Sequence, residues 1–136
     1  MSTTAAGTFE LVWDEQPPYL TDEGTTLSKV VVTKTFTGDL EGTSVTELIK
    51  AMTSEPTSAG YVAIERFTGT VHGHKGSFIL QHSAISTRGE GDLSIVVVPD
   101  SGTGELSTIS GKLNVVPTDG KHNYTFEYDL NTDASS

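Results

Sequence analysis

The stretch GYVAIERFTGTV-HGH-KGSFILQHSAIST, residues 60–87, predicts a β-hairpin and decides the fold class. Both arms are rich in β-branched and aromatic residues, and apolar side chains recur at alternate positions, as in a strand with one buried face. The joining residues, His72-Gly73-His74, are few enough for a tight turn. Residues 60–71 and 75–87 are therefore expected to pair as antiparallel strands.

The same alternation continues on both sides of this hairpin, interrupted by turn residues. A loop is marked by Pro17-Pro18 and by residues 22–24, and Asp119-Gly120 marks a turn. The expected strands are 8–13, 27–36, 40–52, 60–71, 75–87, 92–98, 112–116 and 123–130, with one short helical turn near 103–108. This pattern predicts an all-β fold, an eight-stranded antiparallel β-barrel. A two-sheet sandwich has similar strand spacing and stays open as an alternative.

One segment, residues 44–52, carries two patterns. Ser44 and Glu47 can form a helix capping box. The apolar residues also follow the spacing of one helix face: Val45, Leu48, Ile49 and Met52. Local chemistry favours a helix here, whereas the eight-stranded arrangement requires a strand.

Composition excludes several classes of function. The chain has 136 residues, 18 acidic and 8 basic, giving a formal net charge of −10. Such a surface repels phosphate backbones and anionic lipid, so no nucleic acid and no membrane partner is expected. The sequence contains no cysteine, which removes disulfides, thiol nucleophiles and cysteine metal sites.

The length fits a single domain over residues 1–136, with an ordered core of about 7–130. The first residues lack the basic and apolar regions of a secretory signal. The longest apolar run, residues 95–98, is far shorter than the roughly 20 residues that cross a bilayer. A cytoplasmic location is the expectation.

The central hairpin brings two titratable side chains together. A type II′ turn that begins at Gly73 places Glu65 opposite His82, and Gly69 opposite Phe78. The remaining residues of that face are mostly apolar, so it is expected to point into the barrel, whereas Arg66 and Gln81 point outward. A carboxylate and an imidazole on an apolar wall can exchange a proton near neutral pH, which makes Glu65 and His82 candidate catalytic residues.

Two other interpretations of this pair stay open. Glu65 and His82 can simply satisfy each other as a buried structural pair. A turn one residue longer would instead place Glu65 opposite Gln81 or Ser83. The inward aromatic and aliphatic residues, including those of 122–128, can form the wall of a ligand pocket or plain core; these candidate ligand-binding residues are Tyr61, Phe67, Phe78, Leu80, Tyr124 and Tyr128.

Other motifs give no support for cofactor chemistry. His72 and His74 are expected at the exposed tip of the hairpin, where they cannot converge on a metal, so no metal site is expected. The glycine-rich segment 100–106 lacks the lysine spacing of a phosphate-binding loop. No nucleophile elbow of a serine hydrolase is present in the sequence. We therefore expect no cofactor.

Several motifs together resemble a bacterial family of unknown function, domain of unknown function 3224. They are GDLEGTS (38–44), GYVAIER (60–66), GSFILQH (76–82), VVPDSGTGEL (97–106) and HNYTFEY (122–128), in the family's order. The resemblance covers roughly residues 7 to 130. It implies a fold like that of allene oxide cyclase, a small eight-stranded barrel that associates into dimers or larger rings.

The resemblance carries no agreed activity. Barrels of similar fold include cyclases that bind a reactive hydrophobic substrate inside the barrel, and by this analogy Glu65 and His82 would act as acid and base in an isomerase or cyclase. Our first hypothesis is therefore a barrel that binds a small hydrophobic or amphipathic molecule. The alternative is a non-enzymatic homo-oligomeric interaction module, since residues 30–32 and 95–98 put apolar side chains on both strand faces.

Overall fold

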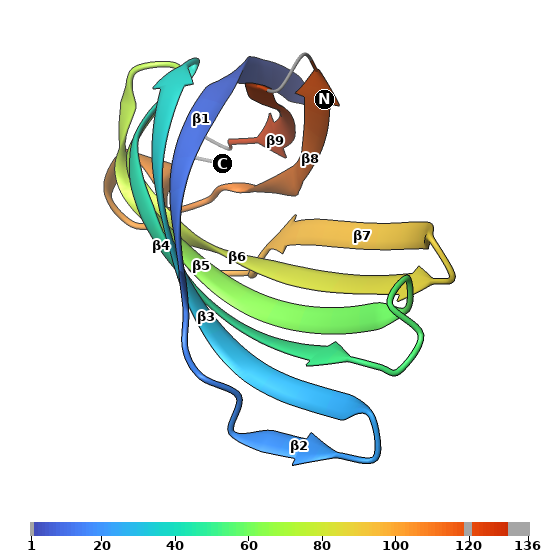
Figure 1. The fold of residues 1–136 in the computed structure, drawn as a ribbon. Helices are drawn as coiled ribbons and strands as arrows, with labels where there is room; N and C mark the ends of the chain where they lie inside the picture. The colour runs from blue at the N-terminus through green and yellow to red at the C-terminus, as the bar shows by residue number, and fades with distance from the viewer. Residues whose placement is uncertain (1, 119–120, 131–136) are drawn as a thin grey trace.

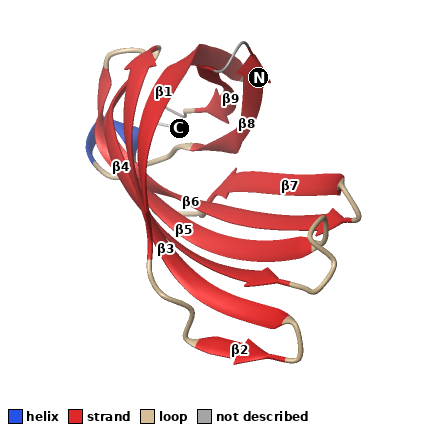
Figure 2. Cartoon of the chain, viewed as in Figure 1, coloured by secondary structure: helices blue, strands red, loops and turns tan. Residues whose placement is uncertain are grey.

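The computed structural model describes residues 2–118 and 121–130, most of which lie in β-strands. The strands are β1 (Thr3–Glu15), β2 (Leu20–Asp22), β3 (Thr25–Gly38), β4 (Leu40–Met52), β5 (Ala59–Val71), β6 (His74–Thr87), β7 (Glu90–Val97), β8 (Ser110–Thr118) and β9 (Lys121–Asp129). The described residues contain one helical segment, the 3-10 turn η1 (Gly104–Leu106) (Figure 2). The predicted all-β class and helical turn are confirmed, while the turn predicted at 119–120 lies outside the described residues.

Eight of these strands form a closed antiparallel barrel. Neighbours follow the order β1-β9-β8-β7-β6-β5-β4-β3, and β1 also pairs with β3, which closes the ring. Figure 1 shows β3 to β7 fanning out side by side, with β8 and β9 next to the start of β1. The predicted barrel is confirmed, and the sandwich alternative is excluded.

The ninth strand, β2, lies where the sequence predicts only a loop. Because β1 ends at Glu15, the first residues of β3 extend beyond it and lack a neighbour there. β2 pairs with this extension through a turn at Glu23 and Gly24, whose φ angles of 49° and 85° are both positive. Two positive φ angles define the type I′ turn, which matches the twist of a hairpin.

The ambiguous segment 44–52 is a strand. β4 pairs along its length with β3 on one side and with β5 on the other. Its inward side chains include Ser44, Thr46 and Leu48, whereas Val45 and Ile49 point outward and are half exposed. The helix favoured by local spacing is therefore wrong, because two complete ladders of backbone hydrogen bonds outweigh the local pattern.

The central hairpin forms with a different turn from the one predicted. Val71 pairs with His74, so the turn residues are His72 and Gly73, with φ angles of 47° and 82°. This type I′ turn replaces the predicted type II′ turn at Gly73-His74. The register consequently shifts by two residues along β6.

The shift gives each residue a new partner across the hairpin but leaves each side chain on the same face of the sheet. Glu65 faces Leu80 instead of His82, and His82 faces Ala63. Phe78 pairs with Phe67, so the predicted pairing of Phe78 with Gly69 is also wrong. Since side chains alternate with a period of two, a shift of two leaves Glu65 and His82 on the same inward face.

The barrel interior has two parts. At the end near the turns 38–39 and 72–73, which we call the closed end, a buried apolar cluster fills the interior and includes Phe36, Phe67, Phe78, Tyr124 and Phe126. The 3-10 turn adds Leu106 and the following segment adds Ile109 to this cluster. At the opposite end, which we call the open end, a smaller cluster lines the wall: Val30, Val32, Leu48 and Ala63.

Among the described residues, the barrel wall has the fewest paired residues between β7 and β8. In the described residues these two strands pair at one position, Val96 with Lys112. By contrast, β8 pairs with β9 from Ser110 to Thr118. Towards the open end, β7 and β8 diverge, as Figure 1 shows. We call this part of the wall the β7–β8 seam.

Candidate functional site

Glu65 lies inside the barrel between the two clusters, with a side chain only 1% exposed. Its Oε1 accepts hydrogen bonds from His82 Nε2 at 2.7 Å and from Lys34 Nζ at 3.2 Å. Its Oε2 accepts a hydrogen bond from Ser44 Oγ at 2.5 Å. Both carboxylate oxygens are therefore occupied by donors from β3, β4 and β6.

The predicted meeting of Glu65 and His82 occurs by a diagonal contact. His82 on β6 is opposite Ala63 on β5. The small side chain of Ala63 leaves room for the imidazole to reach the carboxylate of Glu65, two residues further along β5. Diagonal neighbours on one face of a sheet lie within reach of long side chains. The contact is thus formed in a register that the sequence argument did not consider.

The surroundings of Glu65 hold its carboxyl in the charged form. Burial by itself raises the pKa of this carboxyl, because the charged form loses its hydration. Interaction with His82, the charge of Lys34 and the hydrogen bond from Ser44 outweigh burial and lower the pKa to about 2. At neutral pH Glu65 is ionised, so it is a hydrogen-bond acceptor and a weak base.

An ionised Glu65 fixes the proton arrangement of His82. A carboxylate only accepts hydrogen bonds, so the proton on the contact must belong to Nε2 of the imidazole. In the neutral ring the other nitrogen, Nδ1, is then a hydrogen-bond acceptor. Nδ1 makes no hydrogen bond with the described residues, and His82 lines the cavity described next.

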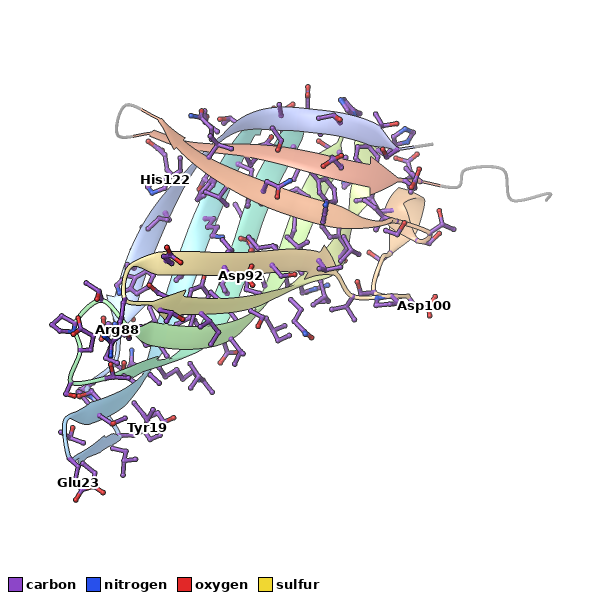
Figure 3. All side chains as sticks on the ribbon, turned by 90° about the vertical axis from the view of Figure 1, so that its right-hand side faces the viewer. Tyr19, Glu23, Arg88, Asp92, Asp100 and His122 are labelled. Carbon is purple, nitrogen blue, oxygen red and sulfur yellow. The ribbon has the colours of Figure 1, made fainter. Side chains whose placement is uncertain are left out.

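A cavity of about 190 Å³ opens at the open end of the barrel. Its wall is mostly apolar: Phe9, Leu11, Trp13, Val32, Leu48, Leu93, Ile95 and Val115. Lys34, Thr46, Tyr61, His82 and His122 add polar groups to this wall. Figure 3 shows β7 with Asp92 and the strand that carries His122 on opposite sides of the β7–β8 seam.

Thr46 has the least satisfied polar group in this wall. It is 2% exposed and faces Glu65 across the β4–β5 ladder. Its Oγ1 is the one buried side-chain N or O atom among the described residues that has no hydrogen-bond partner. Buried polar groups are nearly always paired, and this hydroxyl beside the cavity keeps a hydrogen-bonding capacity that no described residue uses.

Tyr61 and Lys34 complete the polar part of the wall. The Tyr61 hydroxyl makes no hydrogen bond with the described residues; burial, helped by the charge of Glu65, raises its pKa. Tyr61 therefore keeps its proton at neutral pH and can donate it in a hydrogen bond. The Lys34 ammonium lies 5.1 Å from the ring centre of Phe9 and donates to Glu65, so it is held in place by a ring and a carboxylate.

The sequence matches the model of a known protein family. The family model described as "Protein of unknown function (DUF3224)" matches residues 5–128, most of the chain. This chain belongs to that family. The resemblance predicted from its motifs is confirmed.

One solved structure of the DUF3224 family is very similar to this chain. It is the crystal structure of a protein with unknown function from Shewanella oneidensis MR-1, and the two sequences are 38% identical. The match covers 96% of this chain and 98% of that chain, with a TM-score of 0.90. No curated protein matches this DUF3224 chain.

The cavity of this DUF3224 protein contains only part of the predicted ligand-binding set. Tyr61 lines it. The other five residues belong to the buried cluster of the closed end and do not line the cavity: Phe67, Phe78, Leu80, Tyr124 and Tyr128. The physical reason is that aromatic side chains from several strands pack against one another there, such as Phe67 on Phe78 at 5.1 Å.

Sequence reasoning missed Lys34, Ser44 and Thr46. All three occupy inward positions of β3 and β4, in phase with the buried apolar residues, so the period of two would have shown that they face inward once a strand was assigned. The segment 44–52 also fits a helix, which hid Ser44 and Thr46. Lys34 was missed because a lysine is seldom buried unless it is paired, and its partner Glu65 lies 31 residues away.

The histidines at the hairpin turn have a separate environment at the closed end. His72 Nδ1 lies 2.5 Å from the Tyr128 hydroxyl, and Nε2 lies 3.4 Å from a carboxylate oxygen of Asp39. These contacts connect the β3–β4 turn, the β5–β6 turn and β9. Among the described residues no group of three or more histidine, cysteine, aspartate or glutamate side chains is arranged to hold a metal ion. No described helix has the length and apolar character needed to cross a membrane.

Proposed function

We propose that this protein binds a small amphipathic molecule in the cavity at the open end of the barrel, and that His82 can exchange a proton with it. The observation that carries the proposal is the buried, unpaired hydroxyl of Thr46 on the wall of an apolar cavity. A bound molecule with one polar group and an apolar body would satisfy Thr46 and cover the exposed ring of Trp13.

The arrangement of His82 supports proton transfer. Glu65 holds the imidazole through Nε2, and Nδ1 is available to a molecule in the cavity. In this arrangement Glu65 is a positioning residue, and His82 is the group that would touch the substrate. The acid and base roles expected for Glu65 and His82 thus become a single carboxylate–imidazole unit.

Binding can be tested with small uncharged probes. Phenol, benzyl alcohol and cyclohexanone would each be titrated into isotopically labelled protein, with chemical-shift changes expected at Thr46, Tyr61 and Leu93. Val115→Trp would fill the cavity and abolish these changes, because Val115 lines it. Val116→Trp is the matched control, since its neighbouring position points outward and is 47% exposed. Absence of binding by all three probes would overturn the proposal.

A second function is favoured by the outer face of the barrel. We propose that β4 and β5 pack against a second copy of the chain through their exposed apolar residues. Ile49 and Val62 are directly paired there, and Ile64 is exposed beside them. This patch carries the ion pair of Lys29 and Glu47, so a twofold axis can pair each Lys29 with Glu47 of the second copy.

Charge makes this patch more suitable for self-association than the rest of the surface. The chain carries a net charge of −10, but the patch holds Lys29 and Glu47, with exposed Arg66 opposite Val45 at its edge. Light scattering would measure the mass in solution, and Val62→Asp should convert a dimer to a monomer. Val12→Asp, on an exposed position of β1, is the control. A monomer at high protein concentration would overturn this second proposal.

A further inference from the structure

We propose that the cavity takes a small uncharged carbonyl compound and exchanges the proton on the carbon next to the carbonyl, with His82 as the base and Lys34, Thr46 and Tyr61 around the oxygen. This inference rests on the proposed function, because it names the class of molecule and the reaction for the same cavity.

The charge balance of the site favours an uncharged ligand. Ionised Glu65 is paired with the Lys34 ammonium at 3.2 Å, so these two charges cancel inside the barrel. A carboxylate ligand would meet Glu65 with no unpaired cation to receive it, and the net charge of −10 would oppose its approach. A cationic ligand would meet the Lys34 ammonium, and both oxygens of Glu65 already accept hydrogen bonds.

The hydrogen-bonding groups favour an acceptor oxygen on the ligand. Tyr61 keeps its proton, Lys34 gives one of its three N–H groups to Glu65, and the Thr46 hydroxyl has no partner. All three can donate to an oxygen in the cavity. The neutral imidazole of His82 donates through Nε2 to Glu65, so its Nδ1 has an accepting lone pair and no proton to donate; His122, the second imidazole of the wall, is exposed and is not fixed by Glu65. A carbonyl compound with an acidic C–H bond next to the carbonyl offers its oxygen to the three donors and its α-proton to the base.

The wall holds the four groups close together. Thr46 lies opposite Glu65 on the neighbouring strand, and His82 reaches that same carboxylate from the other side. Tyr61 precedes Glu65 by four residues on β5, so both side chains point inward, and Tyr61 is close enough for the charge of Glu65 to affect its pKa. A ligand seated against this wall would touch donors and base together.

The proposed step moves one proton and three electron pairs, the first of which is the lone pair of His82 Nδ1 that forms the new N–H bond. His82 Nδ1 takes the proton from the carbon, the C–H bonding pair becomes the C=C bond of the enolate, and the carbonyl π pair moves to the oxygen. Hydrogen bonds from Lys34, Thr46 and Tyr61 stabilise the charge on that oxygen. Ionised Glu65 stabilises the imidazolium through Nε2. The reverse step returns a solvent-derived proton to carbon, so the reaction needs no oxidant or other reactant.

The cavity volume limits the size of the compound. A closed apolar cavity of about 150 Å³ holds one benzene molecule. The volume of about 190 Å³ here therefore fits a single six-membered ring with one carbonyl oxygen. Cyclohexanone is the probe that matches this size, charge and chemistry.

The experiment measures exchange of the α-protons of cyclohexanone in D2O by proton NMR. The wild-type protein should accelerate exchange at least tenfold over an equal concentration of free imidazole, since positioned acid–base groups contribute roughly 10²- to 10⁴-fold. Phenol, which fits the ring-sized space and has no such proton, should inhibit the exchange. His74→Gln, at the first residue of β6 at the closed end, should exchange at the wild-type rate.

Substitutions of His82 and Thr46 test the role of each side chain in the exchange. In His82→Gln, the amide can still donate to Glu65 but cannot accept the proton, so exchange should fall to background while cyclohexanone still binds. His82→Asn gives the same test if the glutamine variant does not fold, as judged by circular dichroism. Thr46→Val should weaken cyclohexanone binding about tenfold, since one hydrogen bond to a buried group is lost.

The possible failures are distinct. Cyclohexanone that binds without accelerated exchange would overturn this inference and leave the binding proposal standing. Binding of phenol and benzyl alcohol without cyclohexanone would overturn the carbonyl class alone. Absence of binding by all probes would overturn both proposals. Exchange that survives His82→Gln, or that phenol does not inhibit, would show that His82 in this cavity is not the base.

Discussion

At the scale of single residues, the chemistry of this barrel depends on how Glu65 is surrounded. Three donors from three strands use both oxygens of its carboxylate and keep it charged. A carboxylate in that state orients its neighbours and has little tendency to take up a proton. In the reaction that we propose, the base is therefore the far nitrogen of His82, a residue that lines the cavity.

The first prediction concerns acid stability. The pKa of Glu65 lies at about 2 in the folded protein, below the ordinary value of 4.5. Stabilisation by the ionised carboxyl is therefore fully present above about pH 5 and is lost as the pH falls towards 2. Glu65→Gln should lower the free energy of unfolding by roughly 3 kcal/mol at pH 7, since each pKa unit corresponds to about 1.4 kcal/mol. Lys34, His82 and Tyr61 are the titratable groups around this side chain.

Urea denaturation at several pH values would measure this effect. The difference between the wild type and Glu65→Gln should shrink from pH 5 to pH 2. Glu10→Gln, on an exposed position of β1, serves as control and should give a curve parallel to that of the wild type. Parallel curves for Glu65→Gln would contradict the prediction.

The second prediction concerns Thr46. Replacing the unpaired hydroxyl by a methyl group in Thr46→Val should raise the free energy of unfolding of the ligand-free protein by about 1 kcal/mol, because an unsatisfied buried group is removed. Thermal and urea unfolding would measure the change. Thr43→Val, on the exposed face of the same strand, should change stability by less than about 0.5 kcal/mol. A destabilised Thr46→Val would mean that solvent already satisfies the hydroxyl.

At the scale of strands and turns, close approach of backbones explains the glycines where β4, β5 and β6 meet. Gly69 lies opposite Gly42 on one side and Gly76 on the other. A Cβ atom at Gly69 would lie 2.1 Å from the carbonyl oxygen of Glu41, which is closer than atoms can approach. A side chain at this position would force the two strands apart.

The third prediction follows from this contact. Gly69→Ala should lower the free energy of unfolding by about 2 kcal/mol or more, because the added methyl group meets rigid backbone. Gly91→Ala is a matched control, since a Cβ atom there meets nothing within 4 Å. Its effect should stay within about 0.5 kcal/mol in chemical denaturation. Equal effects of the two substitutions would show that the strands can separate at Gly69 without cost.

The elements also show which parts of the structure the sequence predicts. Alternation located the long strands, and it correctly placed Glu65 and His82 on one inward face. The turn type was wrong because His72 adopts a positive φ of 47°, which non-glycine residues seldom do. A strand for 44–52 could not be obtained from local spacing, since the hydrogen bonds that decide it come from β3 and β5.

At the scale of the whole molecule, local sequence patterns cannot predict which residues line the cavity. Lys34, Thr46 and His82 come from three strands and meet only when β3, β4, β5 and β6 have paired in the correct register. The inward aromatic residues, for which the sequence left both a pocket wall and plain core open, are core that fills the closed end, apart from Tyr61. Sequence alternation shows which side chains point inward, but it does not show how far along the barrel axis the packing extends.

The fourth prediction concerns closure of the barrel. Because β7 and β8 pair only at Val96 and Lys112 in the described residues, most backbone groups that point towards the β7–β8 seam lack a partner strand, although β7 pairs with β6 and β8 with β9 on their other sides. Hydrogen–deuterium exchange should therefore be faster in residues 91–95 and 113–116 than in β5, which is paired on both sides along its length. Mass spectrometry of peptides would measure the rates. Equal protection of these segments and β5 would contradict the prediction.

The division of the interior into a filled end and a hollow end has a consequence for engineering. Most of the buried apolar side chains belong to the cluster at the aromatic end, so we expect side chains around the mouth of the barrel to contribute less to stability and to tolerate joint variation in a library. Selection at Leu11, Trp13, Leu93 and Val115 could then adapt the cavity to a different ligand, while the aromatic half of the barrel is kept as a constant scaffold.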